Sequence, residues 1–126
     1  MNIDFSEKII TGIKGDATKL SKFILLNSVD ELVCSNPYLG TGFIAEDYFK
    51  EVSKIIKIGK KFVLNGQKQN KFFNEVDKKL IEKYGFQIEH FQVPLLDRFK
   101  NFDFFTTSGS KISNDNMFST VLIKVL

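Results

Sequence analysis

The chain has 126 residues, 43% of them hydrophobic, with 14 phenylalanines and a formal net charge of +3. This length and composition predict one globular domain over residues 1–126 and exclude a chain that is disordered throughout. With no apolar run near the roughly 18 residues of a membrane helix, no signal peptide pattern and one cysteine, we expect a cytoplasmic protein without a membrane partner or internal disulfide.

Strand-like and helix-like segments alternate along the chain. The first half predicts a short strand at 2–5, an apolar patch at 9–13, a helix over 17–26 and a buried strand at 32–34. The second half predicts a helix over 45–58 that Gly59 ends, a strand at 61–64, a helix over 70–84, and strands at 86–93 and 120–126.

This alternation predicts an α/β fold with a largely parallel sheet. Leu32–Cys34 and Phe62–Leu64 are apolar enough to be buried on both faces, so we expect them to be adjacent parallel strands. We expect residues 120–126 to run antiparallel near one edge. Cys34 then reads as a small buried apolar residue, and Asn65-Gly66 as an ordinary turn that closes its strand.

The charge is concentrated in the middle of the chain. Residues 50–83 hold ten lysines and four acidic residues, whereas residues 1–49 hold four lysines and seven acidic residues. The simpler interpretation is the solvated face of amphipathic helices. The other is a surface for an acidic protein or for RNA. No cysteine and histidine cluster has metal-site spacing, so we expect no metal.

The strand expected at Leu32–Cys34 ends in a polar turn with the sequence Ser35-Asn36-Pro37-Tyr38. Open α/β sheets bind ligands beyond the carboxyl ends of their strands, and this turn follows such an end. Pro37 stops the strand because it has no N–H for a sheet ladder. Two interpretations remain open: a ligand-binding segment, or an ordinary turn with Tyr38 packed at the edge.

Several segments, taken in order, resemble motifs of the class I S-adenosylmethionine (SAM)-dependent methyltransferases. The segments are Asn2-Ile3-Asp4, then GDATKL from Gly15, then SVDELVCSNPY from Ser28, then KKFVLNG from Lys60, and finally TVLIKVL from Thr120. The resemblance covers nearly the whole chain. It implies a Rossmann-like, mostly parallel sheet with an antiparallel C-terminal strand.

The resemblance also implies a site. Asp4 would bind the ribose hydroxyls of SAM, Asp16 would accept a hydrogen bond from the adenine amino group, and Ala17 would present its backbone N–H. Asn36-Pro37-Tyr38 would be the catalytic segment, with a carbonyl oxygen toward a substrate amino group and Tyr38 stacked on a planar target. Simpler interpretations compete, namely a solvated Asp4, an Asp16 helix cap and a structural turn at 36–38.

One departure from the family is large, because its first strand and Gly-x-Gly-x-Gly loop have no counterpart here. The resemblance therefore implies a domain truncated at its amino terminus, with SAM-dependent methyl transfer when complete and weak or absent cofactor binding as it stands. A non-catalytic binding module and a C-terminal effector or toxin domain of a larger polypeptide remain as alternatives. Exposed sheet edges favour a homo-oligomer.

Overall fold

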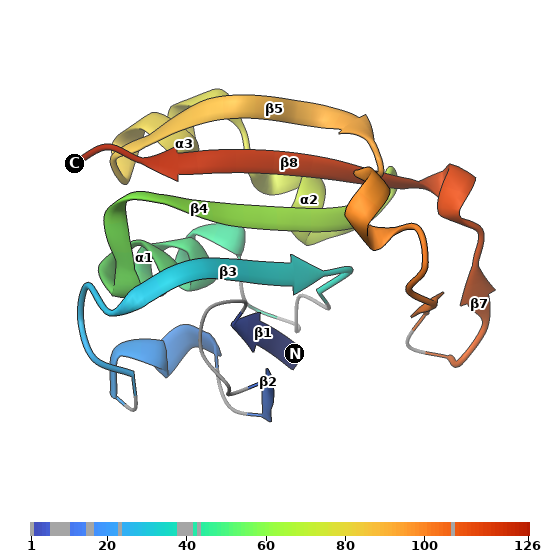
Figure 1. Ribbon diagram of the computed structural model, residues 1–126, viewed down its shortest axis with the longest axis horizontal. Coiled ribbons are helices and arrows are strands. Elements are labelled where there is room, and N and C mark those ends of the chain that lie inside the picture. The colour runs from blue at the N-terminus through green and yellow to red at the C-terminus, as the bar shows by residue number, and fades with distance from the viewer. Residues whose placement is uncertain are drawn as a thin grey trace.

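The computed structural model describes residues 2–5, 11–14, 17–22, 24–37, 42, 44–106 and 108–126. In this part of the chain, a six-stranded sheet has the order β2-β1-β3-β4-β8-β5, with the α-helices on one side (Figure 1). Its strands are β1 (Asn2–Phe5), β2 (Thr11–Lys14), β3 (Val29–Ser35), β4 (Ile56–Gln67), β5 (Phe86–Pro94) and β8 (Met117–Lys124).

The remaining elements are short helices and one small hairpin. The α-helices are α1 (Ala45–Ile55), α2 (Lys71–Glu75) and α3 (Lys78–Lys83). The 3₁₀ helices are η1 (Ala17–Lys22), η2 (Asp97–Phe99) and η3 (Asn114–Asn116). The hairpin joins β6 (Phe104–Phe105) and β7 (Lys111–Ile112).

The centre of the sheet has the strand arrangement that the sequence predicts. β3 and β4 are adjacent and parallel, with Leu32 opposite Phe62 and Cys34 opposite Leu64, which confirms that prediction. β8 runs antiparallel to both β4 and β5 and lies next to the edge strand β5, as expected. The crossover between β3 and β4 contains α1, as a parallel connection requires.

The prediction of a mostly parallel sheet is wrong. Among the described strand pairs, β3–β4 is parallel, while β1–β2, β1–β3, β4–β8 and β5–β8 are antiparallel. The sheet is therefore mixed. The physical reason is that β1 pairs with β3 directly and in the antiparallel sense, with Ile3 opposite Cys34, and that its pairing with β2 is antiparallel as well.

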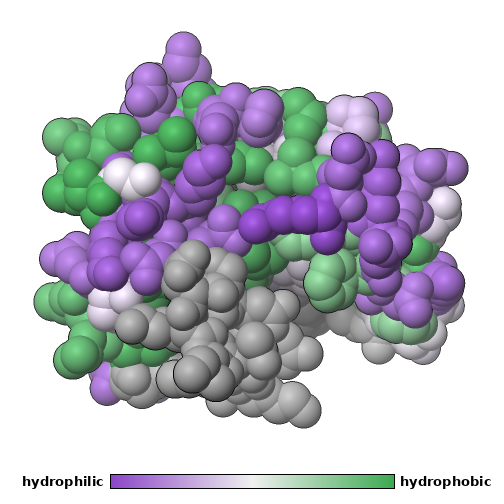
Figure 2. Space-filling view, viewed as in Figure 1, coloured by the Kyte–Doolittle hydropathy of each residue, from purple (hydrophilic) through white to green (hydrophobic). Residues whose placement is uncertain are grey.

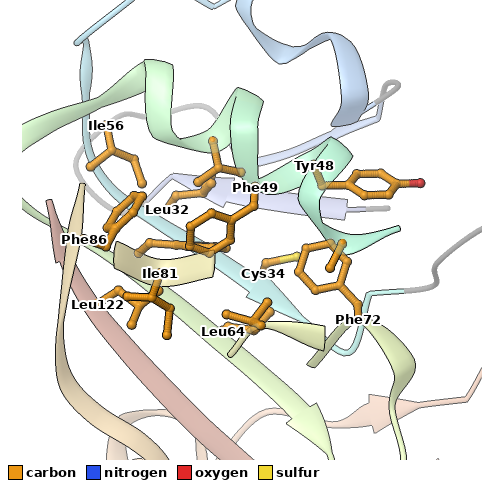
Figure 3. Close-up of a cluster of buried hydrophobic side chains, with 14 of the residues drawn as sticks. Leu32, Cys34, Tyr48, Phe49, Ile56, Leu64, Phe72, Ile81, Phe86 and Leu122 are labelled. Atoms are coloured by element: carbon orange, nitrogen blue, oxygen red, sulfur yellow. The ribbon is translucent and has the colours of Figure 1, made fainter. Parts of the chain in front are cut away.

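The helix-side face of the sheet carries the larger core. Side chains alternate between faces along a strand, so Leu32, Cys34 and Leu64 point to the same side. Phe49 of α1 is fully buried there, and its ring lies 5.2 Å from that of Phe86 in an edge-on arrangement. Figure 3 shows these side chains packed together between the sheet and the helices.

The opposite face is covered by the connection between β5 and β8, which contains η2, η3 and the small hairpin but no α-helix among its described residues. Val33, Val63 and Val121 point to this side and pack against the segment that joins β5 to β8. That segment contributes Leu95, Phe99, Phe104 and Ile112, and Met117 at the start of β8 packs with them. Figure 2 looks onto this face and shows mostly polar side chains across its middle and right-hand side.

All three predicted helices differ from the observed ones. The helix expected over 45–58 ends at Ile55, since Ile56 is already extended and begins β4. Gly59, expected to end the helix, has a φ of +86° inside β4, where the pairing with β3 is irregular. A positive φ is available to glycine at no steric cost, so Gly59 accommodates the irregularity instead of ending a helix.

The helix expected over 70–84 is two helices. α2 ends at Glu75, and Asp77 begins α3 by accepting a hydrogen bond from Leu80 N at 2.9 Å. An aspartate in this position favours a new helix start over continuation. The helix expected over 17–26 is the shorter 3₁₀ helix η1. Within the described residues, no helix has the length and apolar character to cross a membrane.

Candidate functional site

The carboxyl ends of β3 and β4 meet at one edge of the sheet, and their polar residues come together there. Parallel strands end at the same edge, and Ser35 lies opposite Asn65 in the pairing. We call this group the polar edge. It consists of Ser35 at the end of β3, Asn36 and Pro37 after it, Asn65, Gly66 and Gln67 at the end of β4, and Asn70 before α2.

Asn36 forms the corner of the polar edge. Its φ of +46° lies in the left-handed region, which asparagine tolerates better than most residues. Its backbone N–H donates to Asn65 O at 2.6 Å and so ties the turn to β4. Pro37 follows and is buried, and it stops the ladder as the sequence predicts.

The Asn36 side chain is turned toward the protein. Its Oδ1 accepts hydrogen bonds from Gln67 N at 3.3 Å and from Asn70 Nδ2 at 3.0 Å. Asn70 Nδ2 also donates to Pro37 O at 3.0 Å. Two carbonyl oxygens from the turn therefore share one amide nitrogen. Asn70 Oδ1 meanwhile accepts from Phe73 N at 2.9 Å and caps α2.

A buried hydrogen-bond chain supports the polar edge from below. Asn65 is fully buried; its Oδ1 accepts from Ser119 Oγ at 2.7 Å and its Nδ2 donates to Ser35 Oγ at 3.3 Å. Ser119 Oγ accepts in turn from Leu96 N at 3.2 Å. Buried polar groups that are satisfied in this way hold neighbouring strands in one arrangement.

Asn65-Gly66 is not the turn that the sequence predicts. β4 continues through both residues to Gln67 and pairs with β8, with Gly66 opposite Phe118. A Cβ at Gly66 would lie 2.8 Å from atoms of the Phe73 side chain. Glycine is needed here because the Phe73 ring, from α2, packs directly onto the backbone of β4.

The predicted site residues lie in different parts of the structure, and some lie outside the described residues. Asn36 and Pro37 lie at the polar edge, whereas Tyr38 and Asp16 fall outside the described residues. Asp4 is in β1, opposite Val33. Because β1 runs antiparallel to β3, the carboxyl end of strand β1 lies away from the polar edge. Ala17 begins η1. Their proposed roles stay predictions. Asn70 of the polar edge and Ser119, which supports it through Asn65, were not predicted as site residues.

Several charged side chains in the described part of the chain are paired. Glu46 of α1 accepts from Lys83 Nζ at 2.6 Å and from Tyr84 Oη at 2.7 Å, which joins α1 to α3. These hydrogen bonds hold the pKa of Glu46 below its usual value and raise the pKa of Lys83 and of Tyr84. At the end of β8, burial lowers the pKa of Lys124, whose Nζ donates to Tyr84 O at 2.9 Å.

The surface hollows in the described part of the chain include the following two. The larger, of about 530 Å³, lies between α3, the start of β5 and Leu126, far along the sheet from the turn after β3. The smaller, of about 330 Å³, includes Pro94, Met117 and Phe118. Met117 is paired with Gln67, so the smaller hollow adjoins the polar edge. Neither is lined by Asn36 or Pro37.

Known structures share this fold, although no protein-family model and no curated protein matches the sequence. A SAM-dependent methyltransferase from Methanosarcina mazei is similar with a TM-score of 0.57 and 19% identity, over 94% of this chain and 71% of that chain. The PH0226 protein from Pyrococcus horikoshii OT3 is similar with a TM-score of 0.51 and 16% identity, over 94% and 61% of the two chains. The chain has a methyltransferase-like α/β fold.

Proposed function

We propose that the protein acts in SAM-dependent methyl transfer, with the polar edge on the side of the methyl acceptor. The observation that carries this proposal is the convergence of Asn36 Oδ1 and Pro37 O on one nitrogen, 3.0 Å from each. An amino group has two N–H donors, so two such oxygens can orient it. The likeness to a methyltransferase structure supports the class of reaction.

The described residues do not fit the cofactor side of such a domain. β1 pairs directly with β3 in the antiparallel sense, so among the described residues no parallel strand followed by a glycine-rich loop lies beside β3 on that side. We therefore propose that residues 1–126 alone bind SAM weakly or not at all. The proposal assigns no step to the cofactor and limits Asn36 and Pro37 to holding the acceptor.

A non-catalytic binding module is the second candidate, and a specific observation favours it. The edge of β3 is already closed by β1, and the two turn oxygens already have a donor from Asn70. A domain with this arrangement can use its surface for a partner without any methyl transfer. The two candidates differ in one outcome, which is whether labelled methyl groups leave SAM.

The test uses the full natural chain that contains these residues. It is incubated with methyl-labelled SAM and an extract of its own cells, beside the variants Asn36→Ala and Asp77→Ser. Methyl transfer predicts label in a discrete acceptor with the wild type and with Asp77→Ser, and a large loss with Asn36→Ala. The absence of label with all three proteins, all folded, would overturn the proposal and leave the binding module.

The surface and location predictions also stay proposals. Five lysines of the 50–83 block have acidic partners among the described residues, as in Lys57 with Asp30 at 2.9 Å and Lys61 with Glu89 at 2.9 Å. This pairing reduces the charge that remains for an acidic protein or RNA. We propose a cytoplasmic protein, with self-association through the edge strand β5 as its route to a homo-oligomer.

A further inference from the structure

Lys124 is a buried cation without an anionic partner in the described part of the chain. It ends β8 and is 9% exposed. Its Nζ donates to Tyr84 O at 2.9 Å, and the ion pairs among the described residues do not include it. A lysine ammonium has three N–H donors, and a buried charge is costly unless an opposite charge accompanies it. The surroundings of Lys124 therefore favour an anion that the described residues do not supply.

The larger surface hollow, of about 530 Å³, adjoins the Lys124 ammonium. Gly85 and Phe86 line the hollow. Nζ lies 5.2 Å from the centre of the Phe86 ring, and a Cβ at Gly85 would be 3.3 Å from Nζ. The buried Ile81 and Phe86 and the exposed Leu126 make much of the lining apolar. The volume is typical of small-molecule sites, which span roughly 300–1,000 Å³, so the hollow can hold an apolar group beside a cation.

The charged residues that line the hollow offset each other. Lys78 and Glu82 lie four residues apart on α3, so they occupy the same face of the helix, and both are exposed. Lys124 therefore gives the hollow and its surroundings their net positive charge. Burial lowers the pKa of Lys124, as expected for a buried charge without compensation, and a bound anion would oppose this effect.

We propose that this hollow binds an aliphatic monocarboxylate, whose carboxylate contacts Lys124 Nζ and whose chain lies against Ile81, Phe86 and Leu126. One cation beside an apolar wall matches a ligand with one negative charge at the end of an apolar chain. The site is separate from the polar edge, because β8 begins opposite Gln67 and ends opposite Phe86. Figure 1 shows the two ends of β8 at opposite sides of the sheet. The inference therefore does not depend on methyl transfer.

Binding is measured with octanoate on the chain of residues 1–126, by the backbone amide NMR shifts of Gly85 and Leu126. Butyrate has the same carboxylate but a shorter chain, and octanamide has the same chain without the charge. We expect octanoate to shift both signals saturably and to bind at least about tenfold more tightly than either comparison compound. The Asn36 amide, at the polar edge, should not shift. Equal affinity for the three compounds, or no saturable shift with octanoate, would overturn the inference.

Lys124→Met removes the charge but keeps an apolar side chain of similar length. The matched control is Lys79→Met, because Lys79 is an exposed lysine of α3 that does not line the hollow. Octanoate should bind Lys124→Met at least about tenfold more weakly than the wild type, whereas Lys79→Met should bind it as the wild type does. Unchanged affinity in Lys124→Met would contradict the inference, and so would an equal loss in both variants, which would indicate general attraction to surface lysines.

A second variant covers the case in which Lys124→Met does not fold. Leu126→Ala shortens an exposed side chain that lines the hollow, so it should leave folding unchanged. It should weaken the binding of octanoate by about threefold or more and leave that of butyrate nearly unchanged. An octanoate affinity equal to that of the wild type would refute the proposed contact. Because SAM is absent from every titration, the result is independent of whether methyl transfer occurs.

Discussion

Replacing Asn36 tests whether the turn after β3 depends on one side chain. Asn36→Ala removes the acceptor for Gln67 N and Asn70 Nδ2, and each lost hydrogen bond costs about 1 kcal/mol. Alanine at the observed φ of +46° adds roughly 1–2 kcal/mol of backbone strain. We therefore expect the free energy of unfolding to fall by about 3–4 kcal/mol. This is more than the ~1 kcal/mol that a simple turn residue would contribute.

Two matched variants separate the contributions. Asn36→Gly loses the hydrogen bonds but not the backbone conformation, so its cost should be about 2 kcal/mol. Asn36→Asp keeps an acceptor and should cost less than about 1 kcal/mol. Urea unfolding followed by circular dichroism measures the free energy of unfolding of all three variants. Equal slopes of this free energy against urea concentration indicate that the variants expose the same surface on unfolding. If alanine, glycine and aspartate cost the same, the hydrogen bonds and the strained φ are not what holds the turn.

Three further predictions concern the supporting structure. Gly66→Ala places a Cβ 2.8 Å from Phe73 and should destabilise the fold by about 1–3 kcal/mol in urea unfolding; a smaller change would mean that α2 moves freely. Asp77→Ala removes the cap of α3 and should cost about 1 kcal/mol, measured in the same way. The pKa of Glu46 is lowered in the folded protein, so its stabilisation is complete above the ordinary glutamate pKa of about 4.3 and is lost as the pH falls through the lower folded value. Thermal unfolding of wild type and Glu46→Gln should therefore converge in acid, and a constant gap across pH would contradict the assignment.

The sequence predicts the centre of this fold well because local pattern and burial agree there. The apolar runs of β3 and β4 could be buried on both faces, and the helix between them made a parallel pair the expected arrangement. The orientation of β1 was not predictable in that way. Its direction depends on pairing between Ile3 and Cys34, which are far apart in the chain and carry no signal for parallel or antiparallel pairing.

Part of the candidate site, the turn after β3, could be predicted from the sequence, and the residues that contact it from other elements could not. Asn36 and Pro37 follow an apolar strand, and that position alone predicts an edge where ligands bind. Asn70 could have been predicted as a helix cap from its place before Lys71–Glu75. Nothing in the local pattern indicates that its amide reaches back 34 residues to Asn36. Ser119 likewise reads as an ordinary strand residue until β8 pairs with β4.

Titration calorimetry with SAM and with S-adenosylhomocysteine on residues 1–126 tests the central claim most directly. The claim is that this chain has the acceptor side of a methyltransferase-like fold without a complete cofactor side, since β1 closes the edge of β3. The account predicts no saturable heat for either compound below about 1 mM. One-to-one binding at micromolar concentration would contradict it, because the cofactor side would then be complete within these residues.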